Sequence, residues 1–266
     1  MSHSIAWMTD THFNLLKPEE FKIFVAQLNS SGFTDLWLTG DISCGTEICF
    51  HLSYLAENFP GQIYFILGNH DYYKLFIAES RQMVQKLSQK YSNLHYLTFE
   101  NQPVPFNEDT ALIGDDGWYD GLWREPQTSL IFWWDWYFIK DFRCLFSAEE
   151  RLTLMQKLAH DALNRIRTNL ESALKTHSTI YLLSHIPPWP ARHRWKLIEN
   201  FWKPYNSSKL LASMLMDLMT EHPDKKLIVL SGHTHLKRQE EISHNIELRV
   251  GEANFHSPQV QELIEL

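Results

Sequence analysis

The sequence is poor in cysteine, glycine and proline. Its 266 residues include only 3 Cys, 10 Gly and 11 Pro, while 44% are hydrophobic. An odd number of cysteines without regular spacing is not a disulfide framework, so Cys44, Cys49 and Cys144 are expected to be free thiols in a reducing compartment. The low content of chain-breaking residues and the large hydrophobic share exclude a disordered chain and indicate a sizeable buried core.

Positive charge and long apolar segments are also lacking. The net charge of −8 and the pI near 5.9 argue against a broad nucleic-acid-binding face, which would require a basic patch. The most apolar run, residues 130–139, contains Asp135 and is shorter than the roughly 18 residues of a membrane-spanning helix. The N-terminus has no basic region typical of a signal peptide. We therefore expect a cytoplasmic protein with no membrane partner.

Strand-like and helix-like segments alternate along most of the chain. Short apolar runs predict buried strands at residues 4–9, 36–38, 63–67, 111–113, 180–183 and 227–230. Apolar residues at helical spacing predict helices after Pro18, through residues 48–55, after a capping box at Ser147, and through residues 210–218. Alternating segments at 237–242 and 246–250 predict antiparallel strands. This order predicts a parallel sheet covered by helices, in a single domain of residues 1–266.

Polar side chains that bind metals well follow five of these apolar runs. They are Asp10, His12, Asp41, Asn69, His70, Asp71, His185, His233 and His235. In open α/β sheets, ligands bind beyond the carboxyl ends of the strands, so these residues can meet in one crevice. Because alternate residues of an extended chain point to the same side, Asp10 can act with His12, and His233 with His235.

The donor chemistry selects a class of metal. Two Asp, one Asn and four His of this set provide oxygen and nitrogen without thiolate, which suits manganese, iron, zinc or cobalt better than calcium. Seven residues are too many for one ion but suit two ions that share a bridging carboxylate. Two divalent ions, two carboxylates and a hydroxide leave a net charge of about +1, which favours an anionic phosphate substrate.

The motif series D-x-H, GD, GNH[DE], a His followed by prolines, and GH-x-H resembles that of the calcineurin-like metallophosphoesterases. It extends from residue 10 to residue 235. The resemblance implies a four-layer α/β/β/α sandwich with a dinuclear metal site at the strand ends. It implies that one metal is held by Asp10, His12, Asp41 and His235, and the other by Asn69, His185 and His233 with Asp41 bridging. It further implies that metal-bound hydroxide is the nucleophile and that His70 protonates the leaving oxygen.

Two departures from the family pattern concern the protein phosphatases. Those members continue from the bridging Asp as GD-x-x-D-R, whereas Cys44 stands at the second Asp position here and no Arg follows. The third motif reads Gly-Asn-His-Asp instead of GNHE. Both differences argue against a Ser/Thr protein phosphatase. They also leave His70 without an orienting carboxylate, for which the adjacent Asp71 is a candidate.

An aromatic-rich insertion of about residues 115–146 has no regular period. It could cover the site, where Trp118 and Tyr119 would stack on a flat leaving group, or it could simply pack onto the domain. After His185, the basic residues Arg192 and Arg194 could hold a second phosphate or form a solvated charge run. These four residues, with Asp71, are the candidate substrate contacts.

The sequence therefore predicts a phosphoesterase with two metal ions (Mn, Fe or Zn) that hydrolyses a small-molecule phosphomonoester or phosphodiester, a nucleotide-like ester among them. Two alternatives stay open. One is a nuclease of the same family, against which the acidic balance argues. The other is a catalytically silent scaffold that binds proteins, against which the intact ligand set argues. The substrate, the preference for monoester or diester, and the oligomeric state do not follow from the sequence.

Overall fold

Two β-sheets face each other in the computed structural model, which describes residues 2–123, 133–191 and 204–266. The first sheet has the order β11-β1-β2-β3-β4, with β1 Ser4–Met8, β2 Asp35–Thr39, β3 Gln62–Ile66, β4 Leu94–Tyr96 and β11 Glu262–Glu265. The second has the order β5-β6-β7-β8-β10-β9, with β5 Val104–Pro105, β6 Thr110–Asp115, β7 Thr179–Ser184, β8 Lys226–Ser231, β9 Arg238–Ser243 and β10 Ile246–Val250. Neighbouring strands are parallel except for the pairs of β11, β5 and β9, which are antiparallel.

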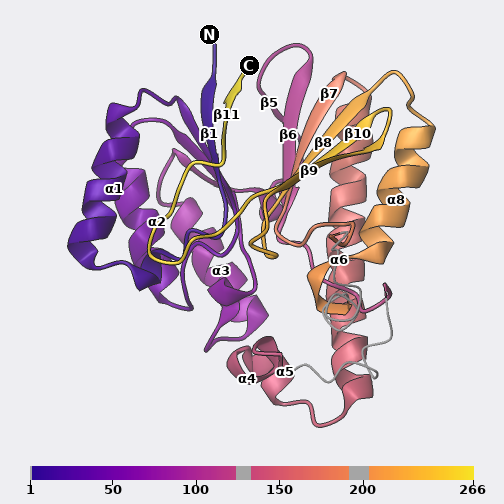
Figure 1. The fold of residues 1–266 in the computed structure, drawn as a ribbon, viewed down its shortest axis with the longest axis horizontal. Helices are drawn as coiled ribbons and strands as arrows, with labels where there is room; N and C mark the ends of the chain where they lie inside the picture. Colours follow the sequence, from indigo (N-terminus) through magenta and orange to yellow (C-terminus); the bar gives the residue numbers. More distant parts are fainter. Residues whose placement is uncertain (1, 124–132, 192–203) are drawn as a thin grey trace.

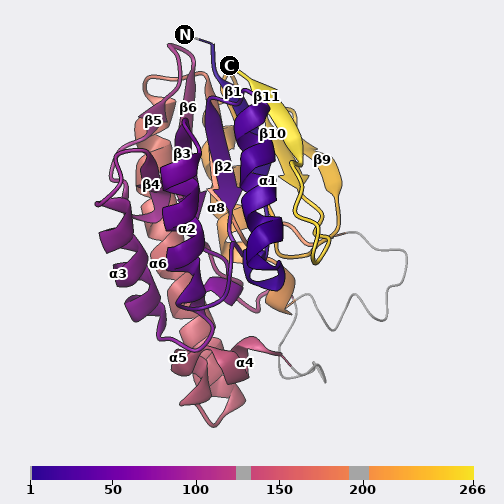
Figure 2. The ribbon, with the colours of Figure 1, turned by 90° about the vertical axis from the view of Figure 1, so that its left-hand side faces the viewer.

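Helices cover the outer face of each sheet (Figure 1). The first sheet is covered by α1 Pro18–Ser30, α2 Glu47–Asn58 and α3 Ile77–Ser88, which lie in front in Figure 2. The second sheet is covered by α6 Ala148–Leu174 and α8 Lys209–Thr220. Short 3-10 helices lie at Phe13–Leu15, His70–Tyr72 and Leu97–Phe99. This arrangement confirms the predicted four-layer α/β/β/α sandwich.

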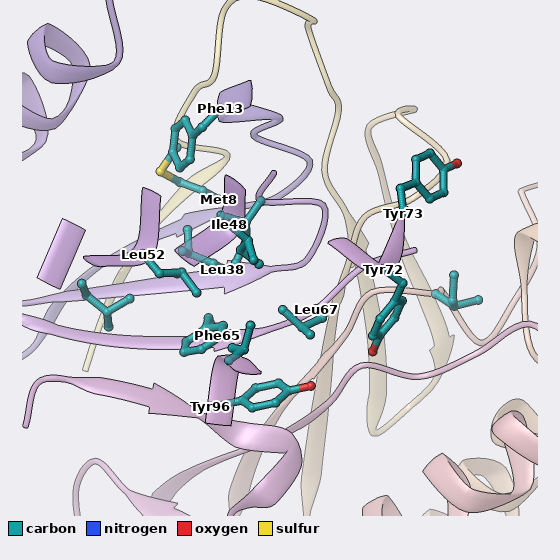
Figure 3. Packing of buried hydrophobic residues seen from close by; sticks show 14 of the residues in the cluster. Met8, Phe13, Leu38, Ile48, Leu52, Phe65, Leu67, Tyr72, Tyr73 and Tyr96 are labelled. Atoms are coloured by element: carbon teal, nitrogen blue, oxygen red, sulfur yellow. The ribbon is translucent and has the colours of Figure 1, made fainter. Parts of the chain in front are cut away.

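The central strands are buried on both faces, so alternate side chains enter different layers of the core. In β2, Leu36 and Leu38 pack against the helices of the first sheet, whereas Trp37 lies between the two sheets. In β8, Val229 faces α6 and α8 while Leu230 lies between the sheets. Figure 3 shows the cluster under α1–α3, where Tyr72 and Tyr73 point in opposite directions.

The predicted helix starts are confirmed by their hydrogen bonds. Ser147 accepts from the backbone N–H of Glu150, and the Glu150 carboxylate accepts from that of Ser147, so α6 begins with a capping box. Pro18 occupies the first position of α1. The antiparallel pair near the C-terminus is β9 and β10. Among the elements that were not predicted are α3, β4, β5 and β11.

The described part of the aromatic-rich segment packs against the core. It includes the short helices α4 Asp135–Phe138 and α5 Lys140–Arg143, which lie at the end of the molecule opposite the two termini (Figure 1). Trp118, Trp133 and Phe142 belong to the same buried cluster as the residues under α1–α3. In the part of the chain that the structure describes, no helix combines the length and apolar character that crossing a bilayer requires.

Candidate metal centre

The loops that follow β1, β2, β3, β7 and β8 meet at one edge of the two sheets. All of these strands end there with their carboxyl ends, as expected for parallel strands. Each loop contributes at least one of the residues expected to bind metal. Five of the seven are buried, and His233 and His235 are partly buried.

The first group consists of Asp10, His12, Asp41 and His235, whose ligand atoms all lie within 4.8 Å of one another. The Nε2 atom of His235 is 3.2 Å from Oδ1 of Asp10. The Nε2 atom of His12 is buried without a hydrogen-bond partner and lies 3.9 Å from Oδ2 of Asp41. Burial lowers the pKa of His12 to about 4, so the ring is neutral at neutral pH and one of its two nitrogens carries a lone pair. An unpartnered buried nitrogen beside carboxylates fits a metal ligand.

The second group surrounds the amide oxygen of Asn69. This oxygen is 3.1 Å from Nε2 of His185 and 3.0 Å from Nδ1 of His233. Oδ1 of Asp41 is 3.4 Å from the same His185 nitrogen. The Asp41 carboxylate therefore faces His12 of the first group with one oxygen and His185 of the second group with the other.

Backbone carbonyls fix which ring nitrogen of each histidine faces the centre. Nδ1 of His185 is 2.8 Å from the Thr39 carbonyl, and Nε2 of His233 is 2.8 Å from the Tyr205 carbonyl. A carbonyl only accepts, so each ring directs an N–H there and turns its other nitrogen toward Asn69. The amide oxygen of Asn69 and one nitrogen of each ring therefore converge, and a metal ion that displaces the proton of His185 would find three ligand atoms here. The residues present fit a metal site.

The charges in the centre favour a cation as well. Burial raises the pKa of Asp41, but the neighbouring histidines, His185 first, outweigh burial and hold it well below its ordinary range. Burial lowers the pKa of His185, but the Asp41 carboxylate raises it to about 10. Burial and the charge of His185 lower the pKa of His233 to about 3. Asp10 and Asp41 are thus held as buried anions.

The backbone is unusual at the residues of this centre. Five of them have positive φ angles, namely Asp10 (47°), His12 (41°), Asp41 (49°), His233 (68°) and His235 (56°). Such a left-handed conformation costs roughly 1–3 kcal/mol per non-glycine residue. Glycine is required at two positions where the backbone lies close to these side chains. A Cβ at Gly68 would collide with Asp41, and one at Gly232 would collide with Asp10.

His70 lies at the open side of the centre. Its side chain is 35% exposed, its Nε2 is 3.9 Å from Oδ2 of Asp41, and its ring stacks on Tyr73. Asp71 is turned away from it. The Asp71 carboxylate accepts from the backbone N–H groups of Ser43 (2.8 Å), Gly68 (2.8 Å) and Ile42 (3.3 Å), so this fully buried group joins the loops after β2 and β3.

The predicted substrate contacts in the aromatic segment lie behind the centre. Trp118 is 2% exposed and stacks on Phe142, with ring centroids 5.9 Å apart. Tyr119 is fully buried and its ring faces that of His233 at 6.2 Å. These placements fit the packing interpretation. Arg192 and Arg194 lie outside the described residues.

Two residues near the centre were missed. Asp135 is buried and accepts hydrogen bonds from Asn69, Tyr73, Tyr119 and Trp133. Burial raises its pKa, against the lowering effect of His70 and of these donors. Its sequence signal was its position as the one charged residue in the most apolar run. Phe255 is 48% exposed and lies 5.1 Å from the rings of both His12 and His235, and an isolated Phe in a loop gave no signal.

Comparison with known families settles the relationship. The sequence profile of the calcineurin-like phosphoesterases matches residues 3–237. The chain belongs to this family. It is therefore a metal-dependent phosphoester hydrolase by family, as the strand-end motifs predicted. A comparison with curated proteins finds no significant match.

Three solved structures share the fold. Phosphopantetheinyl hydrolase from Mycobacterium tuberculosis has 13% identity and a TM-score of 0.65, covering 95% of this chain and 90% of its own. A dimetal phosphatase from Danio rerio has 12% identity and a TM-score of 0.56, with 96% and 89% covered. GAP50, described as the anchor in the inner membrane complex of Plasmodium, has 12% identity and a TM-score of 0.52, with 94% and 71% covered. At these identities the similarity concerns the fold alone.

Proposed function

We propose that this protein hydrolyses a small-molecule phosphoester at a dinuclear metal centre. Asp10, His12, Asp41 and His235 would hold one ion, and Asn69, His185 and His233 the other, with Asp41 between them. The observation that carries this proposal is the position of the Asp41 carboxylate, which faces His12 with one oxygen and His185 with the other. The mixed donors favour manganese, iron or zinc. When bound, such ions activate water as a nucleophile and neutralise phosphate charge.

The chain's own residues complete the chemistry. The partly exposed His70 ring stands beside Asp41 at the open side, where it can give a proton to the leaving oxygen. The stacked Tyr73 ring limits how far the His70 ring can turn. Asp10, Asp41 and His185 behind them are buried, and charges in such surroundings interact more strongly than in bulk water.

Exposed aromatic rings beside the centre favour an ester with a flat leaving group, such as a nucleotide-like molecule. Phe255, 48% exposed, lies against His12 and His235. On the His70 side, Tyr73 contacts Phe138 at 5.1 Å, and Phe138 stacks on Trp134 at 5.5 Å. Phe138 and Trp134 are 40% and 58% exposed. Aromatic faces of this kind stack on planar groups.

The alternatives differ from this proposal in specific observations. A nuclease would need a basic surface for the phosphate backbone, and the net charge of −8 argues against it. A silent scaffold has a structural parallel in GAP50, named as an anchor. The convergent ligand atoms and the partly exposed His70 argue against that alternative here. The three cysteines are free, in keeping with the reducing, cytoplasmic compartment expected from the sequence.

The test is hydrolysis of p-nitrophenyl phosphate and bis-p-nitrophenyl phosphate by the full chain, reconstituted with Mn²⁺ or treated with chelator. We expect turnover that depends on metal, and the ratio of the two rates gives the preference for monoester or diester. Protein with two bound ions by elemental analysis and no turnover of either ester, or of a nucleotide panel, would contradict catalysis. Protein that binds no metal would favour the scaffold.

A further inference from the structure

Asp135 connects the aromatic segment to the candidate metal centre. Its side chain is 1% exposed and both oxygens are fully engaged. Oδ1 accepts from Nδ2 of Asn69 (2.9 Å) and the hydroxyl of Tyr73 (2.8 Å). Oδ2 accepts from the hydroxyl of Tyr119 (2.8 Å) and Nε1 of Trp133 (2.9 Å). The four donors come from three separate parts of the chain, so the carboxylate joins the loop after β3 to the segment after β6.

This contact decides which end of the Asn69 amide faces the centre. The oxygen and the NH₂ group of an amide have almost the same shape, so packing alone does not distinguish them. A carboxylate only accepts hydrogen bonds, so the NH₂ group of Asn69 must face Asp135. The amide oxygen is then left to face His185 and His233. If the amide turned over, oxygen would face the carboxylate and an NH₂ group without a lone pair would face the centre.

The same segment supports His233. The Tyr119 ring faces the His233 ring, and the Trp133 ring meets it edge-on at 6.0 Å. Trp133 also stacks on Tyr205, whose carbonyl accepts from His233. Asn69 and His233 are thus both held from the side of Asp135. Asp10 of the first group accepts from the backbone N–H of His233 (3.0 and 3.1 Å). Among the described residues, no side chain of the first group hydrogen-bonds to Asp135, whose partners are Asn69, Tyr73, Tyr119 and Trp133.

We propose that Asp135 is a positioning residue that fixes the Asn69 amide with its oxygen toward the second metal, and thereby joins the aromatic segment to that metal alone. This inference rests on the proposed function, since it presumes two ions. It predicts that the two ions depend differently on Asp135. Loss of Asp135 weakens the binding of the second ion and leaves the binding of the first unchanged. Substitution of residues that orient metal ligands typically weakens metal binding by about 10- to 100-fold.

The test is Mn²⁺ titration of the metal-free full chain by calorimetry, with elemental analysis of the reconstituted protein. Asp135→Asn replaces an acceptor that faces Asn69 with an amide that can present NH₂. We expect one ion to bind within about twofold of the wild-type affinity and the second about 10- to 100-fold more weakly. Asp141→Asn is the matched control, because Asp141 lies in the same segment and accepts from the Ile77 backbone, without contact to a ligand. It should retain both ions.

A double variant that exchanges the side chains at positions 69 and 135 distinguishes a positioning role of Asp135 from general structural support. In Asn69→Asp/Asp135→Asn the carboxylate and the amide exchange places, so an oxygen again faces His185 while the other accepts from residue 135. The second ion should return in the double variant, including the case in which Asp135→Asn alone fails to fold. Wild-type affinity for both ions in Asp135→Asn, equal loss of both, or no recovery in the swap would overturn the inference. Wild-type protein that binds fewer than two ions would instead refute the proposed function.

Discussion

The ring of Tyr73 stacks on the ring of His70, with centroids 4.4 Å apart and planes inclined by 29°. We infer that this contact takes the place of the carboxylate that orients the equivalent histidine in the pattern of the family's protein phosphatases, where this chain has Cys44. Asp71 does not take over that role, because three backbone N–H groups occupy its carboxylate. We therefore propose that an aromatic neighbour orients His70.

Replacing Tyr73 tests this dependence. Tyr73→Leu removes the stacked ring, and we expect kcat to fall about two- to tenfold, as follows from the loss of an aromatic contact of about 0.5–1.5 kcal/mol. Tyr73→Phe keeps the ring and loses only the hydroxyl that donates to Asp135, so it should stay closer to the wild type. Equal kcat values for Tyr73→Leu and Tyr73→Phe would mean that stacking does not orient His70.

His70 itself is expected to act as the general acid. His70→Ala should lower kcat by about 10²- to 10⁴-fold, because the leaving oxygen then departs without a positioned proton donor. Metal content, measured by elemental analysis, should stay that of the wild type, since His70 is not among the grouped ligand atoms. The effect should shrink for an ester whose leaving group has a low pKa. A variant with normal kcat would make His70 a bystander.

Asp10 and Asp41 should differ in how many ions they control. Asp41 faces both groups of ligands, so Asp41→Ala should remove both metals. Asp10 contacts His235 of the first group, so Asp10→Ala should remove one. Elemental analysis after gel filtration measures the difference. Two ions per chain in Asp41→Ala would disprove the bridging role.

Phe255 provides a test of leaving-group recognition. Phe255→Ala should raise KM for p-nitrophenyl phosphate by about two- to tenfold, the size of one aromatic contact, and leave KM for an alkyl phosphate unchanged. Phe146→Ala is the control, because Phe146 is 90% exposed at the start of α6 and has no contact with the centre. A rise of KM for both esters alike would show that Phe255 supports the loop and does not contact the leaving group.

His51 gives a stability prediction away from the centre. Burial against Phe13 and Phe21 lowers its pKa from 6.5 to about 4, while its Nδ1 is 2.9 Å from the Ser43 hydroxyl. The unfolded chain binds this proton below about pH 6.5 and the folded chain only near pH 4, so stability falls as pH falls through that window. Between pH 7 and pH 5, the free energy of unfolding measured in urea should fall by about 1–2 kcal/mol less in His51→Gln than in the wild type. Parallel pH dependence in both proteins would contradict this assignment.

Much of the fold was predictable because its signals are local. The buried strands are short apolar runs, and α1 and α6 carry their start signals in adjacent residues. β11 was missed because its strand character depends on pairing with β1, where Ser4 meets Glu265 at the other end of the sequence. The helix α3 has only three buried residues in twelve, and this gives a weak periodic pattern.

The candidate site likewise has residues that the sequence predicts and contacts that it does not. The expected ligands follow apolar runs, so the topology of a parallel sheet was enough to bring them together. The roles of Asp71 and Asp135 depend on atoms from distant loops. Asp71 binds the backbone of Ser43, and Asp135 binds Asn69 across 66 positions of the chain. No pattern of residue types along the sequence contains such contacts.

The left-handed backbone at five of the seven expected ligands bears on how this protein would respond to selection for heat resistance. Glycine or asparagine relieves such a conformation, and each relieved position is worth on the order of 1 kcal/mol. Selection for folding alone would therefore enrich these replacements at Asp10, His12, Asp41, His233 and His235, and each would remove or weaken a proposed ligand. Heat resistance and chemistry compete at the same five positions, so thermostable variants that remain active must gain their stability elsewhere in the sandwich.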